Sequence, residues 1–192
     1  QIIIPNAIRD IENMNIEREK IILFAGRFSW EKNPVALINA FAQIQNKNDW
    51  KLIMAGDGPQ WSEMKQKTKS LNIENDVVFL GAVPQLDALF NKASIFVLPS
   101  VLEGFPNALA EAMTAGLPVV CFDSIAYESI ITPGLDGEVV PFNDINELSN
   151  RLQKLINDDK IREKLGLEAS KKAENWKAET IIKQYTQFLK LS

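Results

Sequence analysis

The sequence contains no histidine and only one cysteine, Cys121. Without histidine the chain can supply neither a Ser-His-Asp triad, nor an imidazole general base, nor a His-ligated metal. A single cysteine excludes an internal disulfide and a zinc site made of cysteines and histidines. Cys121 lies in an apolar run, which predicts a small core residue. Any chemistry must therefore use carboxylates, lysine, arginine and backbone dipoles, or a partner must supply the imidazole.

Long apolar runs are absent as well. The longest, over 21–26 and 93–99, are far shorter than the about 20 residues of a membrane-spanning helix, so we expect no membrane segment in this chain. The chain begins at Gln1, with no initiator methionine and no basic segment followed by an apolar stretch. We therefore expect a piece of a longer protein, without a targeting signal.

Neither sign of charge is in large excess. The 192 residues include 21 Lys and Arg against 25 Asp and Glu, a formal net charge of −4. Such a chain has no overall attraction to nucleic acid or anionic lipid, and we expect no nucleic-acid partner. A hydrophobic fraction of 46% with 24% charged residues is typical of a globular protein, and the length fits one domain.

Short apolar runs alternate with segments of helical period. Strands separated by helices indicate βαβ units, and therefore a parallel sheet with helices on both faces. We expect an α/β protein with a Rossmann-like, doubly wound parallel sheet, formed by a single domain over residues 1–192. The predicted strands are 20–27, 50–56, 76–81, 94–99, 117–123 and 138–141, and the predicted helices are 33–44, 60–71, 85–92 and 107–115.

The C-terminal part is predicted to be a helical tail. Apolar positions follow a helical period from 143 to 165, which predicts a packed helix, and 176–191 predicts another. The aromatic residues Trp176, Tyr185 and Phe188 are expected to pack inside the protein, although a terminal helix could also dock on a second domain.

Functional residues are expected in the loops that follow the strands, because ligands of open α/β sheets bind beyond the carboxyl ends of the strands. The loop 26–33 carries Arg27 and Lys32 beside the start of a helix. Two cations next to free backbone amides can bind a phosphate or diphosphate. The same residues are also typical of solvated loop charges, one of them paired with Glu31. The other loops concerned are 56–59, 81–84, 99–107 and 123–126.

The loop 100–107 leads into a predicted helix. Gly104 allows a ligand close to the backbone, and Asn107 is predicted to cap the helix, whose amides would face an anion. Glu103 and Glu111 are eight residues apart, just over two helical turns, so their carboxylates could lie on similar faces and accept hydrogen bonds from sugar hydroxyls. The alternatives are a solvated helix residue for Glu111 and a capping role for Glu103.

Six stretches follow one another in a specific order and spacing, although each one alone is a weak signal. They resemble the C-terminal, donor-binding half of a GT-B glycosyltransferase of the retaining family 4, or group 1, type. The resemblance covers nearly the whole chain. The stretches are Ile3–Ile8, Phe24–Arg27 with Glu31–Asn33, Leu52–Pro59, Val78–Gly81, Pro99–Met113 and Ala115–Val120.

The resemblance implies a role for individual residues. Arg27 and Lys32 would hold the diphosphate of a nucleotide sugar. Glu103 would contact the transferred sugar, and Glu111 would bind the ribose hydroxyls. The remaining substrate-binding positions are those whose backbone or side chain would line the site, namely Gly26, Val83 beside the nucleobase, Gly104, Phe105, Asn107 and Ala108.

The implied reaction transfers a sugar, with retention, from a nucleotide diphosphate sugar to a glycan or lipid-linked acceptor in cell-surface polysaccharide synthesis. UDP is the nucleotide that the family favours, and no metal or other cofactor is implied. Glu103 could act as a nucleophile in a double displacement, but the resemblance favours front-side attack with Glu103 positioning the sugar. Two alternatives are a non-catalytic nucleotide-sugar-binding module and a GT-B relative such as a nucleotide-sugar epimerase or a glycan phosphorylase.

The resemblance also implies a partner domain. The family's enzymes have two Rossmann-like domains, and this chain corresponds to the second, so the N-terminal acceptor domain would be missing from it. We expect the parent protein to be cytoplasmic, at the inner face of the membrane. We expect the isolated domain to bind a nucleotide sugar weakly and to transfer little or none.

Overall fold

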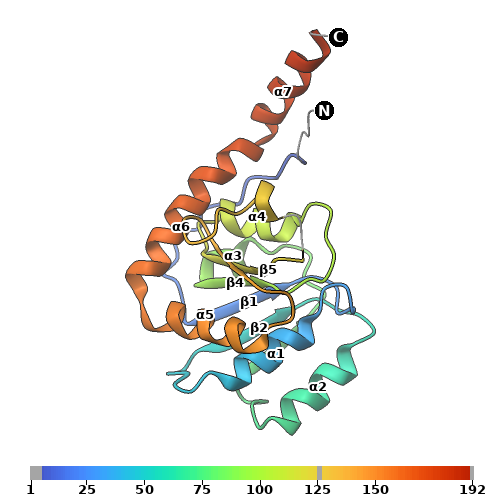
Figure 1. Ribbon diagram of the computed structural model, residues 1–192, viewed down its shortest axis with the longest axis vertical. Helices are drawn as coiled ribbons and strands as arrows, with labels where there is room; N and C mark the ends of the chain where they lie inside the picture. Colours follow the sequence, from blue (N-terminus) through green and yellow to red (C-terminus); the bar gives the residue numbers. More distant parts are fainter. Residues whose placement is uncertain (1–5, 125–126, 191–192) are drawn as a thin grey trace.

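A six-stranded sheet of parallel strands forms the centre of the protein in the computed structural model (Figure 1). The strand order, β3-β2-β1-β4-β5-β6, is the doubly wound arrangement expected for this pattern of elements. The structure describes residues 6–124 and 127–190. The strands are β1 (Ile21–Ala25), β2 (Lys51–Ala55), β3 (Val77–Gly81), β4 (Ile95–Leu98), β5 (Val119–Phe122) and β6 (Glu138–Val140).

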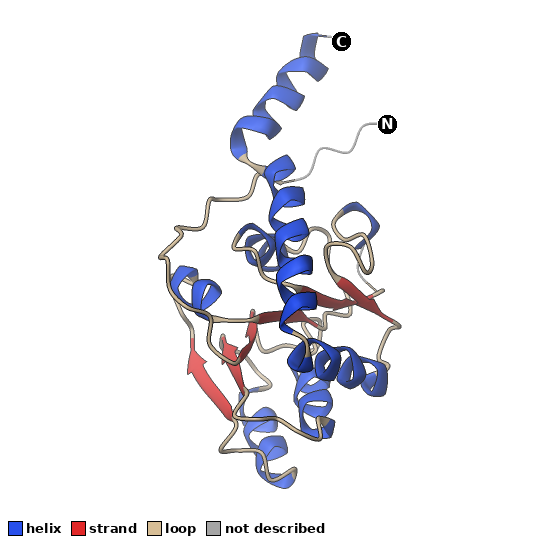
Figure 2. Cartoon of the chain, turned by 90° about the vertical axis from the view of Figure 1, so that its left-hand side faces the viewer, coloured by secondary structure: helices blue, strands red, loops and turns tan. Residues whose placement is uncertain are grey.

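Helices cover both faces of the sheet, as predicted (Figure 2). One face packs against α1 (Pro34–Gln43), α2 (Trp61–Ser70) and α5 (Ile145–Asn157). The other packs against α3 (Asp87–Lys92) and α4 (Asn107–Thr114). The six predicted strands and the four helices predicted between residues 33 and 115 are confirmed, with ends that differ by a few residues.

The continuous apolar character of the strands follows from burial on both sides. In β1, Ile22 and Phe24 point into the core under α1, whereas Leu23 and Ala25 point into the core under α4. Successive side chains of a strand face opposite sides, so a strand in the middle of such a sheet has no face for polar residues. Each fully buried Leu, Ile or Phe contributes about 1.5–3 kcal/mol to folding.

The helix expected from 143 to 165 is wrong, because the chain forms two helices there. The first is α5, and the second is α6 (Asp159–Ala173). Between them Asp158 has an extended backbone, with φ −134° and ψ 99°, and its side chain accepts a hydrogen bond from the Ile161 amide. This is an N-cap, which starts a new helix even though the apolar period continues across it.

A short 3-10 turn, η1 (Tyr127–Ser129), lies between β5 and β6, and a second one, η2 (Glu174–Trp176), follows α6. The last helix, α7 (Ala178–Lys190), comes directly after η2 and extends away from the sheet (Figure 1). Trp176 is buried and its ring packs edge-on against Phe105, as expected. The same expectation is wrong for Tyr185, which is 50% exposed on α7. The side chain of Phe188 lies outside the described part of the structure, as do residues 3–5, 125–126 and 191 of the predicted stretches.

Cys121 is buried in β5, and burial together with the charge of Asp123 raises the pKa of its thiol to about 12. The thiolate is the form that attacks a disulfide reagent, so the native protein is expected to react only when the sheet opens. A chromogenic disulfide reagent at pH 8 should therefore label the folded chain slowly, and label one thiol at once after guanidinium is added. Immediate labelling of the folded chain would contradict this burial.

Candidate functional site

The strand order reverses between β1 and β4, and the crevice at the carboxyl ends of these two strands is where doubly wound sheets bind ligands. Two loops border it, the one that connects β1 to α1 and the one that connects β4 to α4. The Val101 amide donates a hydrogen bond of 2.7 Å to the carbonyl of Glu31, which ties the two loops together.

Lys32 and Glu103 meet across this crevice. The Lys32 ammonium pairs with Oε1 of Glu103, and the hydroxyl of buried Ser100 donates to the same oxygen at 2.9 Å. Ser124 in turn donates to the Ser100 carbonyl at 2.7 Å. The Glu103 side chain is only 10% exposed and that of Lys32 29% exposed, so the pair is partly shielded from water. A cation and a carboxylate predicted from separate loops therefore form one constellation.

The loop that carries Lys32 is a tight turn. The amides of Lys32 and Asn33 both donate to the Ser29 carbonyl at 3.1 Å. Asn33 adopts a left-handed backbone, φ 47°, before Pro34 begins α1. A hydrogen bond from Ser29 and the charges of Arg27 and Lys32 lower the pKa of the Glu31 carboxyl. The turn fixes Lys32 at the mouth of the crevice.

The expectation that Asn107 caps α4 is wrong. The N-cap position is Pro106, Asn107 is the first helical residue, and no side chain of the described chain caps the helix. Asn107 Oδ1 instead accepts a hydrogen bond from the Asn6 side chain at 3.4 Å. The Asn107 amide donates to the Phe105 carbonyl at 3.1 Å and the Leu109 amide to the Pro106 carbonyl at 3.0 Å. Of the first three amides of α4 in the described structure, that of Ala108 therefore keeps its capacity to bind an anion. A side chain at Gly104 would meet no atom within 4 Å, so the space in front of this loop is open.

Glu111 lies in the second turn of α4 and contacts a residue that sequence reasoning missed. Its Oε1 accepts a hydrogen bond of 3.0 Å from Nε of Arg9. Glu103 precedes the helix and binds Lys32, so the two carboxylates engage different cations rather than sharing a helix face. Ala108 lies beside Glu111 on α4, whereas Phe105 packs its ring against Trp176, which leaves only its backbone to face a ligand.

A hollow of about 270 Å³ lies at the carboxyl ends of β1, β2 and β3. Gly26, Arg27 and Val83, all predicted from sequence, line it together. Arg27 is exposed and forms no ion pair with any carboxylate in the described ranges, so its charge is available to a ligand. Close approach of the β1 and β2 loops depends on Gly56, where a Cβ atom would lie 1.8 Å from the Gly26 carbonyl oxygen.

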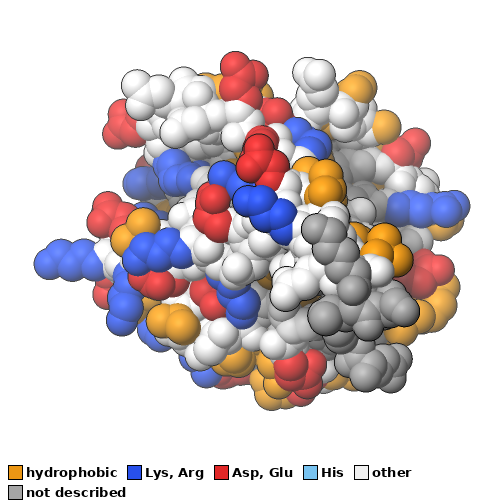
Figure 3. Space-filling view, turned by 90° about the horizontal axis from the view of Figure 1, so that it is seen from above, with side chains coloured by type: hydrophobic (Ala, Val, Ile, Leu, Met, Phe, Trp, Pro, Cys, Tyr) orange, Lys and Arg blue, Asp and Glu red, His pale blue; other side chains and the backbone are white. Residues whose placement is uncertain are grey.

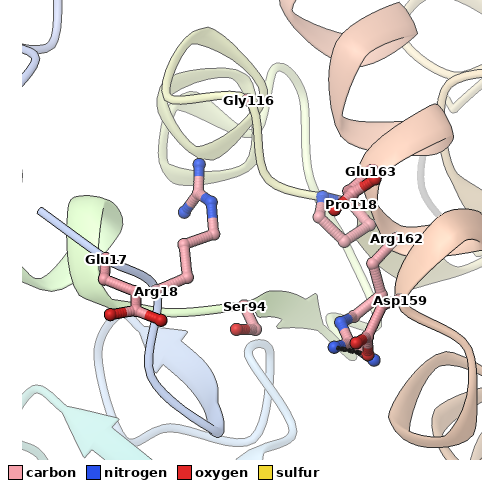
Figure 4. Close-up of a pocket in the computed structure, with 8 residues that line it drawn as sticks. All are labelled: Glu17, Arg18, Ser94, Gly116, Pro118, Asp159, Arg162 and Glu163. Atoms are coloured by element: carbon pink, nitrogen blue, oxygen red, sulfur yellow. Dashed lines mark hydrogen bonds and ion pairs between the residues drawn. The ribbon is translucent and has the colours of Figure 1, made fainter. Parts of the chain in front are cut away.

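A larger hollow, of about 440 Å³, lies at the opposite ends of the strands, where β4 and β5 begin (Figure 4). Its two arginines already have partners within the fold. Arg18 donates to the carbonyls of Phe90, Ala93 and Ala115, at the C-terminal ends of α3 and α4. Arg162 binds the Leu155 and Ile156 carbonyls and pairs with Asp159. These contacts hold helix ends together, so the switch point remains the better candidate site.

Charged side chains of both signs are interspersed on the face seen in Figure 3.

No helix of the described chain is long and apolar enough to cross a membrane. No group of three or more Asp, Glu or Cys residues within the described ranges is arranged to hold a metal ion.

Fold and site together define a doubly wound α/β protein with a lysine–carboxylate pair at its switch point. Residues 7–172 match the family model described as Glycosyl transferases group 1. Because this match covers most of the chain, the protein belongs to that family. The resemblance to group 1 glycosyltransferases noted in the sequence is thereby confirmed.

Among curated proteins, the chain is 31% identical over 181 residues to the GalNAc-alpha-(1->4)-GalNAc-alpha-(1->3)-diNAcBac-PP-undecaprenol alpha-1,4-N-acetyl-D-galactosaminyltransferase of Campylobacter jejuni. The match covers 91% of this chain and 49% of that protein. The chain thus spans about half the length of this relative. It is also 29% identical to the N-acetyl-alpha-D-glucosaminyl L-malate synthase of Bacillus anthracis, in a match that covers 88% of this chain and 45% of that protein.

Solved structures show the same fold. HepE of Anabaena, crystallised with UDP, superposes with a TM-score of 0.84 at 24% identity, over 91% of this chain and 50% of that one. The pneumococcal O-GlcNAc transferase GtfA, solved with UDP and GlcNAc, gives 0.84 at 18% identity, over 96% of this chain and 38% of that one. The predicted fold, one lobe of a GT-B glycosyltransferase, is confirmed.

Proposed function

We propose that the chain is the donor-binding half of a retaining glycosyltransferase that takes its sugar from a nucleotide diphosphate of the UDP class. The observation that carries this proposal is the Lys32–Glu103 pair, which lies at the switch point of a chain of the group 1 family. UDP in HepE and in GtfA supports the choice of nucleotide.

Each part of the site has a task in this reaction. The leaving diphosphate gains negative charge as the bond to the sugar breaks, and fixed cations and amides that face it lower the barrier. Arg27, Lys32 and the Ala108 amide at the start of α4 supply this positive charge. Glu103, held by Ser100, accepts hydrogen bonds from the hydroxyls of the transferred sugar and positions it for front-side attack. Glu111 binds the ribose, and the hollow beside Val83 receives the base.

The whole enzyme, in this proposal, has an N-terminal domain that binds the acceptor. The share of its relatives that the chain covers supports this division. The acceptor is a lipid-linked or surface glycan, in keeping with the name of the Campylobacter relative, and the parent acts in the cytoplasm at the inner face of the membrane. The exposed Ile182, Tyr185 and Leu189 of α7 would pack on the missing domain. A non-catalytic module is not favoured, because Arg27, Lys32, Glu103 and Glu111 are all present.

Replacement of Arg27 by alanine tests the diphosphate site. A charge-assisted hydrogen bond contributes about 1.5–3 kcal/mol, so the variant should bind UDP at least tenfold more weakly, with the binding of uridine unchanged. Titration calorimetry of the chain with UDP, GDP, ADP and uridine measures both effects and identifies the base.

Lys69→Ala is the matched control. Lys69 is an exposed cation in the last turn of α2. Because α2 runs antiparallel to the strands that it connects, its C-terminal end lies near the amino ends of the strands, away from the switch point. The control should bind UDP as the unchanged chain does. Equal affinity of Arg27→Ala and the unchanged chain, or no binding by either at millimolar UDP, would remove the diphosphate assignment.

A further inference from the structure

The segment that precedes β1 is fastened across α3 and α4. Ile8 is buried, and its amide donates to the Trp176 carbonyl at 2.8 Å. Farther along, the Asn91 side chain on α3 donates to the Glu12 carbonyl at 2.7 Å and accepts from the Met14 amide at 3.2 Å. The backbone on both sides of Arg9 is therefore held in place.

Arg9 joins two helices through their carboxylates. Its Nε donates to Glu111 on α4 at 3.0 Å, and its Nη1 donates to Asp87 on α3 at 2.5 Å. Burial alone would lower the pKa of Arg9, but the hydrogen bonds and charges of Asp87 and Glu111 outweigh it and raise that pKa. Arg9 stays charged at any physiological pH, so the bridge is permanent.

The bridge orients Glu111 without using up its acceptors. An ionised carboxylate has two oxygens with about four lone-pair directions, and Arg9 is bonded to Oε1 alone. Oε2 remains for a pair of neighbouring hydroxyls. Without Arg9, the carboxylates of Asp87 and Glu111 would lose the cation that they share, and Glu111 would lose the only ion-pair partner that it has in the described structure.

We propose that Arg9 is a positioning residue for nucleotide binding, which holds Glu111 in the orientation that accepts the two ribose hydroxyls. This proposal rests on the proposed function, in which Glu111 binds the ribose. Arg9 acts through Glu111 and touches no ligand itself. The segment before β1 thereby becomes part of the donor site, although it contributes no atom to the crevice.

A double-mutant cycle with two ligands tests the proposal. The variants are Arg9→Ala, Glu111→Gln and the two combined, and calorimetry measures their affinity for UDP and for 2′,3′-dideoxyuridine 5′-diphosphate, which lacks both ribose hydroxyls. Each single change should weaken UDP binding about tenfold, the size of one hydrogen bond to a charged group. The combined change should weaken it no further than Glu111→Gln does, and the dideoxy ligand should bind all forms alike.

Two further variants separate positioning from general stability. Arg151→Ala removes another arginine that bridges two carboxylates, Glu138 and Glu147, on β6 and α5, and it should leave UDP affinity unchanged. Arg9→Gln retains hydrogen-bond donors and should restore part of the UDP affinity. If Arg9→Ala lowers the melting temperature strongly, Arg9→Met, which keeps an aliphatic side chain but has no hydrogen-bond donor, takes its place in the cycle.

The outcomes distinguish this inference from the proposed function. Unchanged UDP affinity in Arg9→Ala, while Glu111→Gln weakens it, overturns the role of Arg9 and leaves the proposed function standing. Equal loss for UDP and the dideoxy ligand also overturns it, because the effect would then not pass through the ribose. No UDP binding by the unchanged chain, or no effect of Glu111→Gln, overturns the proposed function and this inference with it.

Discussion

Replacement of Gly56 by alanine is expected to destabilise the fold by about 3 kcal/mol, the combined size of a steric overlap and a strained backbone. The new Cβ would lie 1.8 Å from the carbonyl oxygen of Gly26 and 2.9 Å from its carbonyl carbon, and both are backbone atoms that cannot turn away. Gly56 also has φ +151°, which residues with a side chain rarely adopt. In a chain of this length the melting temperature should fall by roughly 6–12 °C, measured by circular dichroism.

Two other glycines are controls for this result. Gly81 has φ +76°, but a Cβ there meets no atom within 4 Å, so Gly81→Ala should cost only about 1 kcal/mol of backbone strain. Gly104 has neither strain nor a neighbour within 4 Å, and Gly104→Ala should melt with the unchanged chain. If Gly56→Ala melted no lower than Gly104→Ala, the close approach of the β1 and β2 loops would be wrong.

The sheet could be predicted from the sequence because its signal is local and repeated. A strand buried on both faces needs apolar residues at every position, and β1, β4 and β5 are buried along their whole length. The helices between them carry an apolar stripe toward the sheet. Six such runs, spaced by helices, leave a doubly wound sheet as the simplest arrangement.

The two wrong predictions about the helices depend on features that the spacing of apolar residues does not reveal. Asp158 ends one helix and caps the next, and this depends on one side-chain oxygen rather than on the spacing of leucines. Tyr185 belongs to an apolar stripe that predicts burial. Ile181, near the start of α7, is buried, but the helix then leaves the body of the described chain and Tyr185 is 50% exposed.

The residues of the candidate site also fall into those that the sequence predicts and those that it does not. Arg27 and Lys32 are found from sequence because a strand end followed by a helix start is a local pattern. The contact between Lys32 and Glu103 cannot be found in this way, since the two residues are 71 positions apart in the sequence and only the folded sheet brings them together. Arg9 gives no signal at all. Its partner lies 102 residues away, and an exposed-looking arginine ahead of the first strand has no feature of a functional residue.

The Lys32–Glu103 pair leads to a prediction in which two ligands respond in opposite directions. In Glu103→Gln, the charge that balances Lys32 is gone, so Lys32 should attract a free diphosphate more strongly and UDP should bind a few-fold more tightly. A neutral amide replaces the carboxylate that accepts sugar hydroxyls, so UDP-glucose and UDP-N-acetylglucosamine should bind about tenfold more weakly. Calorimetry with UDP and each UDP-sugar on the same protein measures both changes.

Lys32→Ala completes the comparison, because it should weaken UDP and UDP-sugar together, by about 10- to 100-fold, as the loss of a charge-assisted contact with phosphate requires. It also leaves Glu103 with the Ser100 hydroxyl as its partner in the described structure, so that an uncompensated carboxylate repels the diphosphate. Parallel changes in Glu103→Gln for UDP and UDP-sugar would show that Glu103 only holds the loop. Opposite changes require that phosphate and sugar lie on the two sides of this one ion pair, because no general loosening of the crevice can strengthen one ligand while it weakens the other.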